Sequence, residues 1–76
     1  MDIRFEARAY LSDQEQEELT NWATAHGSDN DLGFVLIGRD DIVVHGILGD
    51  AWAIAREPGH LSDALDRGLA NMRAVG

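Results

Sequence analysis

Residues 32–48 read LGFVLIGRDDIVVHGIL, and this stretch decides the fold. Two apolar runs of strand length, 32–37 and 42–48, flank the polar segment GRDD at 38–41, which has the composition of a turn. This pattern predicts a β-hairpin. Neither run alternates cleanly between apolar and polar residues, which favours central strands that are covered on at least one face.

The stretch before the hairpin predicts a strand followed by a helix. Residues 2–11 alternate between apolar and mainly charged side chains, which is typical of a half-buried strand. Ser12 and Glu15 have the spacing of a capping box, so we expect a helix to begin there. Gly27 is expected to end it, because glycine takes up the left-handed conformation freely. The apolar stripe of this helix comprises Leu19, Trp22, Ala23 and His26.

The stretch after the hairpin, GDAWAIARE at 49–57, allows two interpretations. A turn at Gly49 and Asp50 would lead into a strand with larger side chains on one side and alanines on the other. The larger side chains are those of Trp52, Ile54 and Arg56. The alanines equally permit a short helix capped by Asp50. We favour the strand, because a helix of about seven residues is marginal.

The end of the sequence predicts a second helix. EPG at 57–59 is a break, and Ser62 can cap a helix over 63–74. Its apolar stripe comprises Leu61, Ala64, Leu65, Gly68, Leu69 and Met72. The element order is therefore β-α-β-β-(β)-α in a single domain, 1–76. We predict an α+β fold in which an antiparallel sheet of three to four strands carries two helices on one face, because this buries both helix stripes.

The charge of the sequence is concentrated in its middle. The net charge is −8, and residues 1–8 and 56–76 are each neutral, so the whole excess falls within residues 9–55. An acidic protein repels nucleic acid and anionic membranes and attracts basic surfaces. We therefore expect no direct binding to nucleic acid and no binding to membranes.

Composition also bears on the compartment. Cysteine is absent, which removes disulfides, thiolate zinc sites and thiol catalysis. The start, MDIRFEARAY, alternates charges and lacks the pattern of a targeting segment. No apolar run approaches the roughly 20 residues that span a bilayer. We expect a cytoplasmic protein.

The sequence contains no convincing motif for catalysis, metal or cofactor binding. The histidines at 26, 45 and 60 lack the close spacing of a local pair of metal ligands. HLSD at 60–63 contains the residue types of a catalytic triad, but neighbours in one turn point apart, and a helix cap explains the serine better. DNDLG at 29–33 begins like a calcium loop but lacks the later Gly and Glu. We predict a protein that is not an enzyme and that carries no metal or cofactor.

The acidic segment supplies the candidate binding residues, because its carboxylates face a single cation, Arg39. Solubility through net charge is one interpretation, and a face that binds a basic groove is the other. Carboxylates on successive helix turns lie about 6 Å apart, and alternate strand residues about 6.6 Å apart, comparable with phosphates along a nucleic-acid strand. The residues that we assign to such a partner-binding face are Asp13, Glu17, Glu18, Asp29, Asp31, Asp40 and Asp41.

In size, acidity and lack of cofactor motifs, the chain resembles small phage-encoded inhibitors of DNA-handling machines, especially anti-CRISPR proteins and other DNA mimics. The resemblance implies a protein-binding inhibitor that docks on a Cas effector subunit, occupies its basic nucleic-acid-binding groove and blocks access of DNA. The seven carboxylates would be the contacts, and a phage-encoded protein would act in the host cytoplasm. Such binding is electrostatic and should weaken with salt.

A second resemblance covers residues 51–72, AWAIAREPGHLSDALDRGLANM. This stretch is similar to the strand–turn–helix ending of small HicB-like domains. The similarity implies an antitoxin-like interaction module that binds a basic toxin and uses the open sheet face and Trp52. It predicts salt-resistant association and a large exposed apolar patch. Homodimerisation through an open sheet edge or face also stays open.

Overall fold

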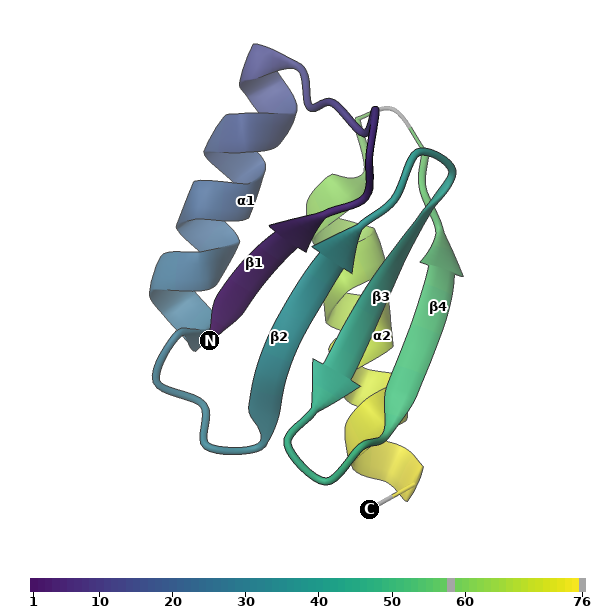
Figure 1. The fold of residues 1–76 in the computed structure, drawn as a ribbon. Coiled ribbons are helices and arrows are strands. Elements are labelled where there is room, and N and C mark those ends of the chain that lie inside the picture. Colours follow the sequence, from purple (N-terminus) through teal and green to yellow (C-terminus); the bar gives the residue numbers. More distant parts are fainter. Residues whose placement is uncertain (58, 76) are drawn as a thin grey trace.

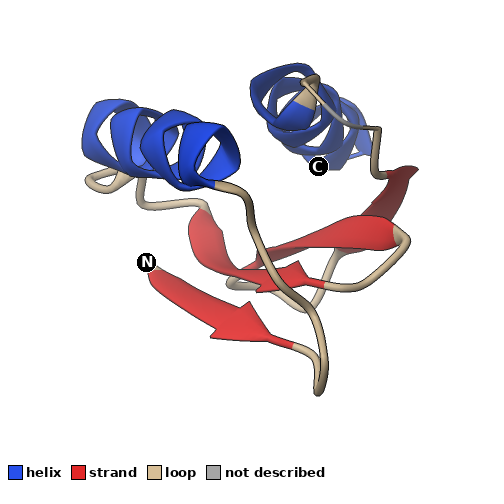
Figure 2. Cartoon of the chain, turned by 90° about the horizontal axis from the view of Figure 1, so that it is seen from above, coloured by secondary structure: helices blue, strands red, loops and turns tan. Residues whose placement is uncertain are grey.

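In a computed structural model, which describes residues 1–57 and 59–75, the chain forms four strands and two helices (Figure 1). In chain order they are β1 (Asp2–Phe5), α1 (Asp13–His26), β2 (Leu32–Ile37), β3 (Asp41–Gly46), β4 (Ala51–Ala55) and α2 (Leu61–Val75). The strands form one sheet in the order β1-β2-β3-β4. Both helices lie on the same face of this sheet (Figure 2). The predicted α+β class is confirmed.

The sheet is mixed. β2 and β3 form the predicted hairpin, and β3 and β4 form a second antiparallel pair. β1 instead runs parallel to β2, with Ile3 beside Val35. A parallel pair requires a crossover, and α1 provides it by carrying the chain back along the sheet (Figure 1). The sheet is thus mostly antiparallel, and β1 departs from the predicted antiparallel pattern.

The first strand is shorter than the alternation of 2–11 predicts. β1 has four residues, and Arg8 has a left-handed backbone with φ 66°, which ends any extended run. The N–H of Glu6 still donates to the Ile37 carbonyl at 2.9 Å, but the N–H of Ala9 turns back onto the Glu6 carbonyl at 3.0 Å. The physical reason is the partner strand: β2 ends at Ile37, so later residues have no neighbour with which to pair.

α1 begins and ends at the predicted residues, but the conformation of its C-cap differs from the prediction. The Ser12 hydroxyl accepts from the Glu15 N–H at 3.2 Å, and the Glu15 carboxylate accepts from the Ser12 N–H at 3.0 Å, which completes the capping box. Gly27 is the C-cap, as predicted, but it keeps a right-handed backbone with φ −63°, so the predicted left-handed conformation is wrong. The chain turns instead through a bond of 3.0 Å from the Asp29 N–H to the His26 carbonyl.

A bulge in β2 explains why its apolar run lacks clean alternation. The pairing with β3 shifts between Leu32 and Phe34. Leu32 and Val35 are therefore both buried, although strict alternation would put them on opposite faces. A Cβ on Gly33 would lie 3.2 Å from the His45 carbonyl oxygen, so glycine suits the bulge.

The ambiguous stretch after the hairpin forms a strand, as favoured. In β4, Trp52 pairs with Val44, and Ile54 pairs with Ile42. Val44 and Ile42 are fully buried under the helices. Because paired residues share a face of a sheet, Trp52 lies on the helix side at the edge, and the expectation that it belongs to the open sheet face is wrong.

α2 begins earlier than predicted. It starts at Leu61, so Ser62 lies within its first turn and is not its N-cap. Its interior glycine, Gly68, packs closely on the sheet, since a Cβ there would lie 2.7 Å from Val44 Cγ2. Pro58, which belongs to the predicted break, lies outside the described residues.

The core lies between the sheet and the helices. It comprises Leu19, Trp22, Leu32, Val35, Ile37, Ile42, Val44, Leu61, Ala64, Leu65, Leu69 and Met72. Every residue of the predicted α2 stripe is buried, whereas Ala23 and His26 of the α1 stripe are half-buried. The stripes of both helices therefore face the core, and that of α2 is the more deeply buried.

Candidate functional site

The fold distributes the seven candidate carboxylates over three places. Asp13, Glu17 and Glu18 lie on α1, and Asp29 and Asp31 lie in the loop between α1 and β2. Asp40 lies in the turn between β2 and β3, and Asp41 is the first residue of β3. The loop and the turn lie at opposite ends of β2, whose six residues span about 20 Å (Figure 1). The fold does not bring all seven residues onto one surface.

Two of these carboxylates are engaged within the protein. Asp29 pairs with Arg73 of α2, and its side chain is only 12 % exposed. It also accepts a hydrogen bond of 3.1 Å from the N–H of Asp31. The Asp41 carboxylate lies over the β2–β3 turn, where it occupies the space that a Cβ on Gly38 would need. The positions of Asp29 and Asp41 are therefore explained by the fold.

Asp13, Glu17 and Glu18, the α1 carboxylates, form no ion pair within the part of the chain that the structure describes. Asp13 and Glu17 are exposed one helical turn apart, on a helix without Lys or Arg. Glu18 is half-buried, and its Oε2 is buried without a hydrogen-bond partner among residues 1–57 and 59–75. A buried acceptor without a donor costs free energy. These three residues are therefore the candidate contacts.

The remaining carboxylate of α1, Glu15, belongs to the fold. Arg56 Nη2 donates to Glu15 Oε2 at 3.2 Å and also to the Tyr10 carbonyl. Arg56 Nη1 donates to the Gly38 carbonyl at 2.8 Å. The Arg56 and Glu15 side chains are 11 % and 12 % exposed. Burial acts to raise the pKa of Glu15, but the Ser12 N–H and the Arg56 guanidinium hold it below its usual value.

A polar contact joins the two helices. The Trp22 indole N–H donates to Asp66 Oδ1 of α2 at 2.8 Å. His26 lies beside it, with Nε2 3.9 Å from the same oxygen and its ring 4.6 Å from that of Trp22. Asp66 therefore has a structural partner in α1, which satisfies the one polar group of a buried tryptophan.

The sheet face opposite the helices carries a stack that the sequence patterns did not predict. The Arg4 guanidinium of β1 lies 4.0 Å from the centre of the Phe34 ring of β2. Phe34 in turn stacks on His45 of β3, with ring centres 4.0 Å apart and planes at 14°. Phe34 points to this face because it alternates with Val35, which is buried under the helices. The stack joins three strands and forms the most distinctive feature of the open sheet face.

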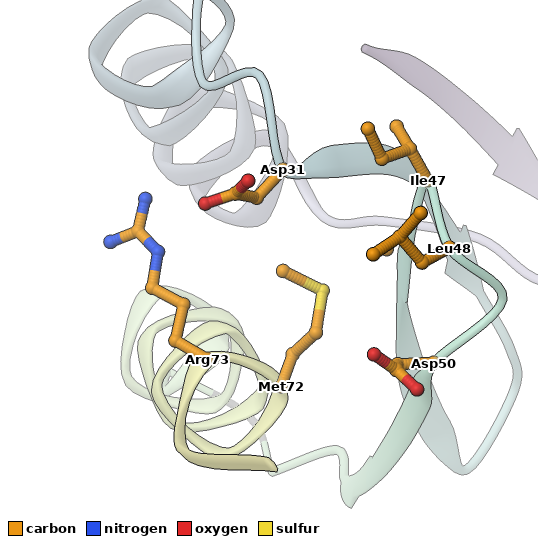
Figure 3. A pocket seen from close by; sticks show the side chains of 7 residues that line it. Asp31, Ile47, Leu48, Asp50, Met72 and Arg73 are labelled. Carbon is orange, nitrogen blue, oxygen red and sulfur yellow. The ribbon is translucent and has the colours of Figure 1, made fainter. Parts of the chain in front are cut away.

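A hollow of about 340 Å³ lies at the end of the sheet where β3 turns into β4 (Figure 3). It is lined by Asp31, Gly46, Ile47, Leu48, Asp50, Met72 and Arg73. Met72 points into it from α2, and Ile47 and Leu48 form its exposed apolar rim (Figure 3). The lining thus combines two carboxylates and one guanidinium with three apolar side chains.

Within residues 1–57 and 59–75, no group of three or more His, Asp or Glu side chains is placed to hold a metal ion. Neither helix in the same part of the chain is long and apolar enough to cross a membrane. Comparisons with protein-family models, curated proteins and solved structures find no match to this chain.

Proposed function

We propose that this protein is a binding inhibitor, not an enzyme, whose α1 carboxylates occupy the basic nucleic-acid-binding groove of a protein partner. The partner class is a Cas effector subunit, and the effect is to keep DNA out of the groove, as in anti-CRISPR DNA mimicry. Asp13 and Glu17 carry the proposal, because they are exposed one turn apart on a helix without Lys or Arg. An arginine or lysine of the partner would pair with these two carboxylates.

The surroundings of the α1 carboxylates favour a basic partner. α1 holds four carboxylates and no Lys or Arg, and within the described residues only Glu15 among the four pairs with an arginine, Arg56. α2 lies beside α1 on the same side of the sheet (Figure 2) and contributes two aspartates against two arginines, so it does not cancel this charge. The net charge of −8 attracts basic surfaces over a longer range and repels DNA itself.

Competition for DNA on purified CRISPR effector complexes tests the proposal. Labelled target DNA and a panel of effectors are titrated with the protein at about 50 mM and about 200 mM salt. We expect the protein to prevent DNA binding by at least one effector at the lower salt. The inhibition should weaken about tenfold or more at the higher salt, because exposed charges are screened. Inhibition that salt does not change, or none on any effector, would contradict the proposal.

The open sheet face supports a second candidate function, an antitoxin-like interaction module. The stack of Arg4, Phe34 and His45 gives this face an aromatic centre that a protein partner could cover. Binding through it would resist salt, would be lost in Phe34→Ala, and would survive charge reversal on α1. Binding through the α1 carboxylates would instead weaken with salt, would survive Phe34→Ala, and would be lost on charge reversal of α1.

A further inference from the structure

The outer edge of β4 is unpaired. β4 is the last strand of the sheet, and no described element lies beyond it (Figure 1). Two hydrogen bonds fix which of its backbone groups face β3. The Asp50 carbonyl accepts from the Gly46 N–H at 2.7 Å, and the Arg56 N–H donates to the Asp40 carbonyl at 2.9 Å. The direction of the N–H and C=O groups alternates along a strand. The N–H and C=O groups at odd positions between 50 and 56 therefore point away from β3.

These outward residues are Ala51, Ala53 and Ala55. Each presents one N–H donor and one C=O acceptor at the edge of the sheet. β4 reads AWAIA, without a charge, proline or bulge, which are the usual protections of an edge strand. β1, at the opposite edge, has an ion pair of 3.7 Å between Arg4 and Asp2. β4 is therefore the edge suited to pairing with another strand.

We propose that β4 pairs antiparallel with β4 of a second copy of this chain, about a twofold axis at Ala53, and joins two sheets into one. In this register Ala53 faces its own counterpart, and Ala51 faces Ala55 of the second copy. Each of these pairs can exchange two hydrogen bonds. Every outward donor then meets an outward acceptor, which a register shifted along the strand does not achieve.

The same register is self-complementary for the side chains. Trp52, which is 37 % exposed, would face Ile54 of the second copy on the helix side, and cross-strand pairs of this type stabilise sheets. Asp50 would lie opposite Arg56, so no like charges are opposed. The occupant that fits this edge is therefore a second copy, because one sequence supplies both halves of each pair.

Ala53→Pro tests the pairing at its centre. The Ala53 N–H points away from β3, so its loss breaks no hydrogen bond to that strand, and proline is tolerated at such edge positions. In the dimer the substitution removes both central donors. Ala53→Val is the matched control, because it keeps the N–H and favours the strand.

Molar mass is measured for the full chain over a concentration series up to about 1 mM, where weak association is detectable. We expect the wild type and Ala53→Val to shift from 8.3 kDa toward twice that mass, and Ala53→Pro to stay at 8.3 kDa. A wild type that remains a monomer, or an Ala53→Pro variant that dimerises equally well, overturns the proposal.

Amide hydrogen exchange of the wild type tests the same pairing without the Ala53→Pro variant, which matters if that variant does not fold. We expect exchange at Ala51, Ala53 and Ala55 to slow as concentration rises, since these amides become bonded in the dimer. A dimer in which the three amides exchange as fast as in the monomer uses another surface, and that result contradicts the pairing.

Discussion

At the scale of single residues, Arg56 connects the segments that meet near the first turn of α1. Its guanidinium donates to the Glu15 carboxylate and to the carbonyls of Gly38 and Tyr10. These groups belong to α1, to the β2–β3 turn and to the segment that follows β1. The Arg56 side chain therefore joins a helix, a turn and a loop that the hydrogen bonds of the sheet do not connect.

Arg56→Met is expected to lower the free energy of unfolding by about 2 kcal/mol, because it leaves the partly buried Glu15 carboxylate without its cation. Urea unfolding measures the change. Arg39→Met is the matched control: Arg39 is exposed and lies 3.9 Å from the Glu6 carboxylate, so its loss should change stability by less than about 0.5 kcal/mol. Equal losses in both variants would show that Arg56 has no special role.

The pH dependence of stability provides a test for Glu15. Because its folded pKa is lowered from the ordinary value of 4.5, the ionised carboxylate stabilises the folded protein above that pH, and this contribution is lost as the pH falls through the folded pKa. Glu15→Gln removes the contribution. The stability difference between wild type and Glu15→Gln should therefore shrink as the pH falls below about 4.5. Parallel urea-unfolding curves across this range would count against the ion pair.

Local patterns predicted the capping box but not the contact with Arg56. Ser12 and Glu15 are three residues apart, so helix geometry alone brings them together. Arg56 lies 41 residues from Glu15, and only the packing of β4 beside the hairpin places it there. The Trp22–Asp66 bond, across 44 residues, was missed for the same reason.

At the scale of elements, α2 packs closely on the sheet through Gly68. A Cβ at this position would lie 2.7 Å from Val44 Cγ2 and 3.7 Å from Ile54 Cγ1. Val44 is fully buried and stiff at χ1, so its methyl group cannot move aside easily. The glycine thus sets the approach of α2 to β3 and β4.

Gly68→Ala is expected to lower the free energy of unfolding by about 1 kcal/mol. Helix propensity favours alanine by about 1 kcal/mol, but overpacking a filled core costs about 1–3 kcal/mol, and the clash should win. Thermal and urea unfolding measure the sign. Val44→Ala serves as the coupled variant, since its own cost should be smaller in the Gly68→Ala background, where it relieves the clash. A stabilised Gly68→Ala protein would contradict the packing described here.

Elements were predictable where their signal is local. The hairpin, β4 and both helices follow from apolar periodicity and turn residues, which act over a few positions. The end of β1 depends on where β2 stops, and the bulge at Gly33 depends on the approach of the His45 carbonyl. The alternation in 2–11 extends past the end of β1, because a local pattern does not show where the neighbouring strand β2 stops.

At the scale of the whole molecule, the acidic middle of the sequence does not become one acidic face. Residues 9–55 include α1 and three strands, so their carboxylates are carried to a helix and to both ends of the sheet. Charge counting predicted a basic partner, which stays a proposal. The sequence could not show which of the seven candidate carboxylates share one surface. The Asp29–Arg73 pair and the burial of Glu18 arise only in the fold.

The most direct test of the α1 carboxylates compares two charge-reversed pairs for affinity to the inhibited effector. Asp13→Lys/Glu17→Lys alters α1, and Asp31→Lys/Asp40→Lys alters the ends of the sheet. Each pair replaces two negative charges by two positive ones and raises the net charge from −8 to −4, so only the location differs. We expect the α1 pair to lose about tenfold or more in affinity, about 1.4 kcal/mol, and the sheet-end pair to lose no more than about twofold. Equal losses, or a larger loss for the sheet-end pair, would contradict this expectation.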